Sequence, residues 1–97
     1  MEQPRGSILI VDDEEPSRAT LSRKLQSDGY ICATANDGEV ALWRTSVQEF
    51  ELVLLDLDMP GMSGMEVLPR MVAAHPDTYV IMMTSIENLP SAVAAIK

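Results

Sequence analysis

Residues 8–13 read Ile-Leu-Ile-Val-Asp-Asp, and residues 52–56 read Leu-Val-Leu-Leu-Asp. Four large apolar residues that end abruptly at a carboxylate are typical of a strand buried on both faces of a parallel sheet. The carboxyl ends of such strands open onto the crevice where sheets of this kind bind ligands. Because carboxylates gathered there repel one another, the two stretches together indicate a site for a hard cation such as Mg²⁺.

Strand and helix patterns alternate along the rest of the chain. We predict strands at 8–11, 30–34, 52–55 and 79–83, and helices at 15–28, after the capping pair Asn36-Asp37, at 64–75 and at 90–97. Such alternation predicts a parallel sheet with right-handed crossovers and helices on both of its faces.

Apolar residues at helical spacing predict which helix faces point to the core. We expect these to be Val40, Trp43 and Val47 in the second helix, and Leu68, Met71 and Val72 in the third. Pro69 conflicts with the third helix, because a proline past the first turn costs about 3 kcal/mol. That helix is therefore expected to start late or to bend.

The size and charge of the chain limit its possible functions. Its 97 residues, of which 46% are hydrophobic, are enough for one small folded domain. A net charge of −8 disfavours nucleic-acid binding by this segment, because affinity for the phosphate backbone comes chiefly from Lys and Arg.

The sequence gives no sign of a membrane segment. No run reaches the roughly 18 apolar residues of a membrane-spanning helix, and residues 1–7 are polar. We therefore expect a soluble, cytoplasmic domain at 8–97 that follows a short tail at 1–7. Cys32 is the single cysteine, which excludes an intramolecular disulfide, and we expect it to be a buried structural thiol.

Polar residues at three strand ends resemble the receiver domain of bacterial response regulators. They are Asp12 and Asp13 after the first strand, Asp56 with Met59-Pro60-Gly61 behind it after the third, and Thr84 after the fourth. An aspartate pair alone is a weak signal, but three sites in this order are a strong one. The resemblance covers residues 8–97 and implies a flavodoxin-like α/β fold, a doubly wound parallel sheet with strand order 2-1-3-4.

The resemblance also implies a role for each site residue. Asp56 would be the phosphoacceptor, which takes a phosphoryl group from a histidine kinase or a phosphotransfer protein. The ligands of Mg²⁺ would be Asp12, Asp13, Asp56 and the backbone carbonyl of Asp58. Thr84 would bind the phosphoryl group and act as a switch, and Ser85 stands where the family has a small residue.

The family pattern continues with a fifth strand that ends in a lysine, and then a fifth helix. Lys97 does not match that lysine, because it follows Thr84 too closely and lies on a helical pattern. We therefore expect an incomplete receiver domain from a longer regulator with an output domain beyond Lys97. The missing strand predicts an exposed edge at residues 79–83, through which the chain would self-associate.

Other interpretations stay open from the sequence alone. Residues 12–15 are all acidic and could be a solvated turn at the positive end of a helix. The chain could also be a receiver-like interaction or dimerisation module that no longer accepts phosphate. Asp56-Leu57-Asp58 further resembles the nucleophile motif of haloacid-dehalogenase-like phosphatases, but those enzymes place their second acidic pair downstream. A receiver domain would catalyse its own phosphorylation and dephosphorylation without being an enzyme for other substrates.

Overall fold

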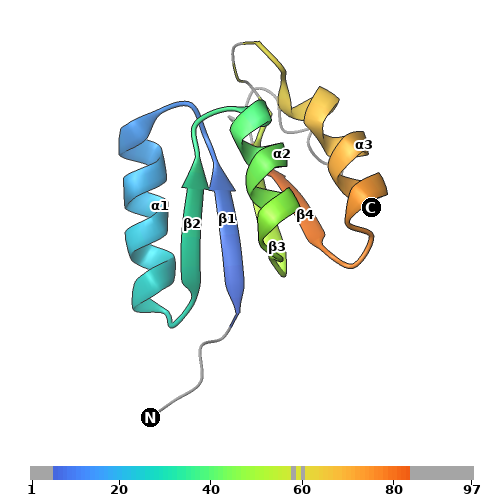
Figure 1. The fold of residues 1–97 in the computed structure, drawn as a ribbon. Helices are drawn as coiled ribbons and strands as arrows, with labels where there is room; N and C mark the ends of the chain where they lie inside the picture. Colours follow the sequence, from blue (N-terminus) through green and yellow to red (C-terminus); the bar gives the residue numbers. More distant parts are fainter. Residues whose placement is uncertain (1–5, 58, 60, 84–97) are drawn as a thin grey trace.

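The computed structural model describes residues 6–57, 59 and 61–83 (Figure 1). Its elements are β1 (Ser7–Val11), α1 (Glu15–Ser27), β2 (Ile31–Ala35), α2 (Gly38–Val47), β3 (Leu52–Asp56), α3 (Gly64–Ala74) and β4 (Tyr79–Met83). The predicted elements are confirmed to within one residue, and the helix predicted at 90–97 lies outside the described residues. Within the described residues, no helix is long and apolar enough to cross a lipid bilayer.

The four strands form one parallel sheet in the order β2-β1-β3-β4, which confirms the predicted topology. Val11 at the end of β1 pairs with Leu55 of β3. The residues that follow these two, Asp12 and Asp56, are therefore brought to the same edge of the sheet. Figure 1 shows the strand arrows pointing toward this edge.

The sheet buries apolar side chains on both faces, because successive residues of a strand point to opposite sides. Leu9, Val11, Val53 and Leu55 join the core cluster with residues of α2 and α3. Ile8 and Ile10 alternate with them and are equally buried, on the side where α1 packs against β1 and β2. The continuous apolar runs of β1 and β3 thus have the cause predicted for them.

The inward face of α2 differs from the prediction. Trp43 and Val47 are 60% and 63% exposed, whereas Gly38, Ala41 and Thr45 are buried. A Cβ added at Gly38 would lie 2.5 Å from Cγ2 of Val67, so small residues let α2 approach α3 closely. Val40 is half-buried and packs against the core, as predicted. The prediction was wrong for Trp43 and Val47, because it followed the large apolar residues and ignored this small-residue face.

The third helix confirms one part of its prediction and corrects two others. Met71 is buried and Leu68 is half-buried, but Val72 is 47% exposed. The helix starts at Gly64 and continues through Pro69, so it does not start late, and the alternative of a bend stays a prediction. Pro69 is exposed, so its ring lies on the solvent side of the helix.

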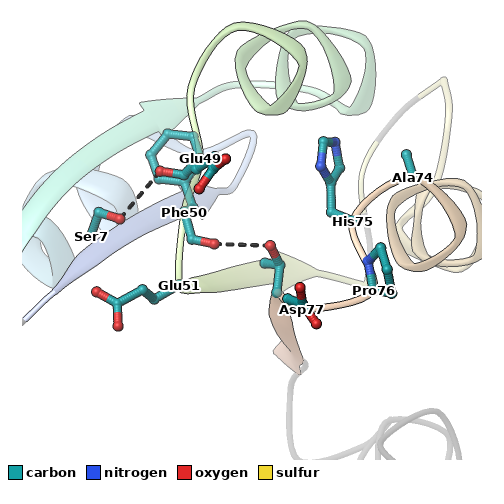
Figure 2. A pocket seen from close by; sticks show the side chains of 9 residues that line it. Ser7, Glu49, Phe50, Glu51, Ala74, His75, Pro76 and Asp77 are labelled. Atoms are coloured by element: carbon teal, nitrogen blue, oxygen red, sulfur yellow. Dashed lines mark hydrogen bonds between the residues drawn. The ribbon is translucent and has the colours of Figure 1, made fainter.

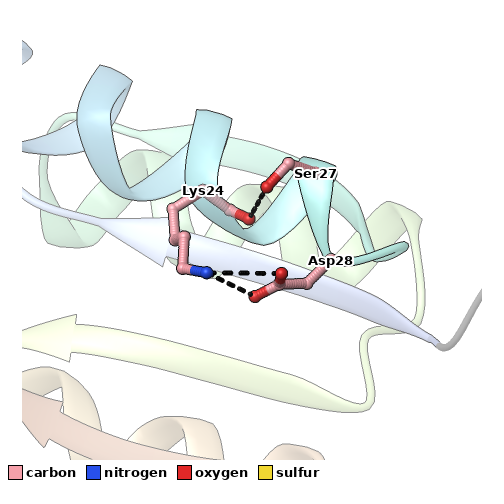
Figure 3. Close-up of polar contacts among 3 residues, drawn as sticks. All are labelled: Lys24, Ser27 and Asp28. Carbon is pink, nitrogen blue, oxygen red and sulfur yellow. Dashed lines mark hydrogen bonds and ion pairs between the residues drawn. The ribbon is translucent and has the colours of Figure 1, made fainter.

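Polar contacts mark the end of α1 (Figure 3). Nζ of Lys24 lies 3.3 Å from Oδ2 of Asp28, and Ser27 Oγ donates a 2.7 Å hydrogen bond to the carbonyl of Lys24. Gly29 has φ 101°, the left-handed conformation that favours glycine, and it ends the helix. The ion pair is exposed, so the helix end depends mainly on this glycine.

Replacing Gly38 with Ala tests the close packing of α2 on α3. Alanine favours a helix by about 1 kcal/mol over glycine, but the added methyl group would collide with Val67. Overpacking costs about 1–3 kcal/mol, so we expect a lower free energy of unfolding, measured by urea denaturation followed by circular dichroism. The matched control is Glu39→Ala, because Glu39 is the exposed neighbour. A Gly38→Ala protein more stable than the wild type would contradict the packing argument.

Candidate functional site

Three of the predicted site residues lie together at the carboxyl edge of the sheet. Asp12 and Asp13 directly follow β1, and Asp56 is the last residue of β3. One carboxylate oxygen from each lies within 4.8 Å of the others. Asp12 and Asp56 are half-buried, whereas Asp13 is exposed, so the cluster is anchored in the sheet and open to solvent on one side.

Asp12 is held by three hydrogen bonds. Its backbone N–H donates to the carbonyl of Ala35 at 3.1 Å, which extends the β1–β2 ladder by one residue. Its Oδ1 accepts from the backbone N–H of Glu14 at 2.9 Å, and its carbonyl accepts from Nη1 of Arg18 at 2.7 Å. These bonds fix the main chain and the carboxylate of Asp12 beside the other two acids.

The donor set fits a hard divalent cation. All three side chains offer carboxylate oxygens, which Mg²⁺ prefers, and Mg²⁺ keeps several waters alongside one or two protein carboxylates. The exposed position of Asp13 leaves room for such waters. Three negative charges at this distance repel one another, so a bound cation would stabilise the folded state.

Gly64, which the sequence predicts only as the start of a helix, also shapes the site. Gly64 is buried at the first position of α3, and a Cβ added there would collide with the carbonyl oxygen of Asp56. Its N–H donates to the carbonyl of Leu57 at 3.3 Å. The start of α3 therefore rests directly on the end of β3, and only glycine permits this approach. Its place in the Gly61-Met62-Ser63-Gly64 run was the available signal.

The other predicted site residues lie outside the described part of the chain. They are Asp58, Thr84 and Ser85, together with Lys97. Met83, the residue before Thr84, pairs with Asp56 in the β3–β4 register, and its carbonyl accepts from the N–H of Leu57 at 2.8 Å. The last residue of β4 therefore lies beside Asp56.

A hollow of about 550 Å³ lies at the opposite end of the sheet, between the segments that lead into β1, β3 and β4 (Figure 2). Thr78 Oγ1 donates to the carbonyl of Phe50 at 2.9 Å, and Ser7 Oγ donates to that of Glu49 at 3.3 Å. These two bonds connect the segment before β3 to the start of β1 and to the segment before β4. Parallel sheets bind ligands at their carboxyl ends, whereas this hollow lies at the amino ends of the strands.

The thiol of Cys32 has surroundings that suit a structural role. Burial raises its pKa, and a hydrogen bond with Ser22 opposes that rise. Cys32 is half-buried on β2, where a buried position was expected. A raised pKa leaves less of the reactive thiolate at neutral pH, in line with the expected structural role.

The whole predicted domain matches a known family. The family model described as the response regulator receiver domain matches residues 8–97. The chain belongs to this family. It is a receiver domain of two-component phosphorelay signalling, with the flavodoxin-like fold that the sequence predicted, and the haloacid-dehalogenase-like alternative is rejected.

Two curated relatives of this receiver domain are transcriptional regulators of greater length. The chain is 36% identical over 92 residues to YkoG of Bacillus subtilis, an uncharacterised transcriptional regulatory protein, and the match covers 95% of the chain and 40% of YkoG. It is 35% identical over 91 residues to the DNA-binding transcriptional regulator NtrC of Salmonella typhimurium, which covers 94% of the chain and 19% of NtrC. The chain thus spans less than half the length of these relatives.

A solved structure supports the same assignment. The response regulator TrrA from Thermotoga maritima, in complex with Mg²⁺-BeF, superposes with a TM-score of 0.85 at 36% sequence identity. The match covers 94% of this chain and 81% of TrrA. The receiver domain therefore shares both its fold and much of its sequence with a protein whose structure was determined with Mg²⁺.

The carboxylate cluster predicts how stability responds to Mg²⁺. We expect Mg²⁺ to raise the Tm of the wild type, and to raise its free energy of unfolding by about 2.7 kcal/mol when the Mg²⁺ concentration is 100 times Kd, with a further logarithmic increase above that. Asp13→Asn should raise the Tm without metal, because it relieves repulsion, and should reduce the Mg²⁺ effect. Asp77→Asn, at the opposite end of the sheet, is the control. The same response in both variants would argue against a cation site at Asp13.

Proposed function

We propose that the chain is a Mg²⁺-dependent phosphoacceptor and that Asp56 receives the phosphoryl group. One observation carries the proposal: in a member of the receiver family, Asp56 lies within 4.8 Å of Asp12 and Asp13 at the carboxyl edge of the sheet. Asp12, Asp13, Asp56 and the backbone carbonyl of Asp58 would hold the cation. When bound, Mg²⁺ would offset the charge of the attacking carboxylate and of the phosphoryl oxygens.

The transfer step is a displacement at phosphorus. A carboxylate oxygen of Asp56 attacks the phosphorus of a phosphohistidine, so that an O–P bond forms while the P–N bond breaks. The departing imidazole nitrogen keeps the electron pair of that bond and takes up a proton. The product is an acyl phosphate on Asp56. Attack by water on the same phosphorus would release inorganic phosphate and restore the carboxylate.

The residues around Asp56 supply positioning. Leu57 and Met59 are buried in the core cluster and anchor the chain directly after β3. Asp56 itself is half-buried, so its carboxylate is fixed by the strand but can still be reached from solvent. Phosphoryl transfer needs little beyond positioning and charge stabilisation; the strand end would supply the first and a bound Mg²⁺ the second.

Further roles belong to the same proposal and rest mainly on the sequence match. Thr84 would bind a phosphoryl oxygen and report phosphorylation, and Ser85 would leave space beside it. The chain would catalyse its own phosphorylation and dephosphorylation without acting on other substrates. Its partners would be a histidine kinase or a phosphotransfer protein and an output domain beyond Lys97, in the cytoplasm. The greater length of YkoG and NtrC supports the output domain.

Intact-mass measurement after incubation with acetyl phosphate and Mg²⁺ tests the acceptor. We expect a gain of one phosphoryl group in the wild type, and no gain in Asp56→Asn or without metal, because the attacking oxygen or its counter-charge is then missing. Asp77→Asn should be labelled like the wild type, and circular dichroism should show that Asp56→Asn is folded. Equal labelling of Asp56→Asn would move the acceptor elsewhere. No labelling of the wild type would favour a non-phosphorylated interaction module.

We also propose that the 97-residue chain self-associates through β4. In the described part of the chain, β4 pairs only with β3, and Tyr79 and Ile81 are 78% and 41% exposed. The N–H of Tyr79 donates toward β3, to the carbonyl of Glu51, so alternation turns the N–H groups of Val80 and Met82 to the other side. A strand edge with exposed apolar side chains is a template for pairing with a second copy.

Light scattering over a range of protein concentrations tests this association. We expect the mean mass to rise with concentration, and to rise further with salt, because the net charge of −8 repels copies of the chain. Ile81→Lys should abolish the rise, since a charge on an edge blocks pairing. Ile31→Lys is the matched control, at an exposed isoleucine on the opposite edge strand. A monomeric mass at every concentration would refute the proposal.

A further inference from the structure

Arg18 makes a contact that the chemistry of the acidic site does not by itself require. It lies in the first turns of α1, and its Nη1 donates a 2.7 Å hydrogen bond, partly buried, to the backbone carbonyl of Asp12. All four residues at 12–15 are acidic. Even so, within the described residues the bond of this guanidinium goes to a main-chain oxygen, and Arg18 forms no ion pair there.

This bond closes the loop between β1 and α1. The chain leaves β1 at Val11, passes Asp12 and Asp13, and enters α1 at Glu15. Arg18 reaches back across the loop from the helix to the strand end. The main-chain groups of Asp12 are then fixed from two sides, by Ala35 at its N–H and by Arg18 at its carbonyl.

The start of α1 makes the loop dependent on such contacts. Glu14 occupies the N-cap position, and its side chain makes no capping hydrogen bond. Asp12 Oδ1 instead accepts from the N–H of Glu14, so the carboxylate that would bind the cation also orders the start of the helix. A shift of the Asp12 backbone would therefore move its carboxylate and loosen this turn.

We propose that Arg18 is a positioning residue for the cation site, which holds Asp12 so that its carboxylate stays beside those of Asp13 and Asp56. The inference rests on the proposed function, because it assigns Arg18 to the site that would bind Mg²⁺. Arg18 touches neither the cation nor the phosphoryl group in this scheme. It acts through the backbone of Asp12.

Positioning and simple electrostatics predict opposite results. A guanidinium near a cation site repels the cation, so removal of its charge alone would tighten Mg²⁺ binding. Loss of a contact that orients a metal ligand weakens binding, typically by 10-fold or more. The direction of the change therefore separates the two effects.

Mg²⁺ titration by calorimetry of the wild type, Arg18→Met and Arg23→Met tests the proposal. Methionine keeps much of the apolar stem and removes the charge and the donors. We expect about 10-fold weaker binding by Arg18→Met. Arg23→Met should change binding little, because Arg23 is exposed on the same helix about 7.5 Å further along its axis. Arg18→Lys should recover part of the affinity, since an ammonium group can still donate to the Asp12 carbonyl. Unchanged or tighter binding by Arg18→Met would overturn the proposal.

Hydrogen exchange of the Glu14 amide without metal gives a readout that does not depend on Mg²⁺. We expect faster exchange in Arg18→Met than in the wild type and Arg23→Met, at equal global stability. Unchanged exchange would show that the Arg18 hydrogen bond does not hold the loop, even if all three proteins bound Mg²⁺. If the wild type bound no Mg²⁺ but the Glu14 amide of Arg18→Met still exchanged faster, Arg18 would be shown to hold the loop. The proposed Mg²⁺-dependent function alone would then fail.

Discussion

The parallel pairing of β1 with β3 is the constraint on which the rest of this receiver domain depends. Its register aligns Val11 with Leu55, and the next residue on each strand is a carboxylate. The pairing buries apolar side chains on both faces of the two central strands, and that burial offsets the repulsion between the acids at their ends. A slip of one residue would exchange the side chains of the two packed faces and separate the acids, so core packing and the site share one determinant.

The strands could be predicted from the sequence because their signal is strong and local. In a chain where strand and helix patterns alternate, runs such as Ile8-Leu9-Ile10-Val11 indicate buried parallel strands. Their order along the chain then implies the topology. The faces of the helices could not be predicted equally well. Trp43 and Val72 were assigned to the core for their size, whereas close contact between α2 and α3 selects Gly38 and Ala41. The distance between two packed helices depends on both of them, so it cannot be predicted from the sequence of either helix alone.

The site residues also fall into those that could be predicted from the sequence and those that could not. Asp12, Asp13 and Asp56 were predicted together because strand ends of a parallel sheet converge on one edge. The supporting contacts were missed. Arg18 acts through one main-chain oxygen, and Gly64 acts by lacking a side chain, so neither leaves a pattern of spacing or charge in the sequence. The atoms that hold a site in place are often backbone atoms, and their partners are found only in three dimensions.

The exposed position of Trp43 determines what optical methods can detect in this domain. It is the single tryptophan of the chain, and 60% of its surface faces water in the folded state. Its intrinsic emission should already resemble that of a solvated indole, and collisional quenchers should reach it freely. The fluorescence of this chain is therefore a poor reporter of core melting, but it would respond directly to any molecule that settles on the outer side of α2.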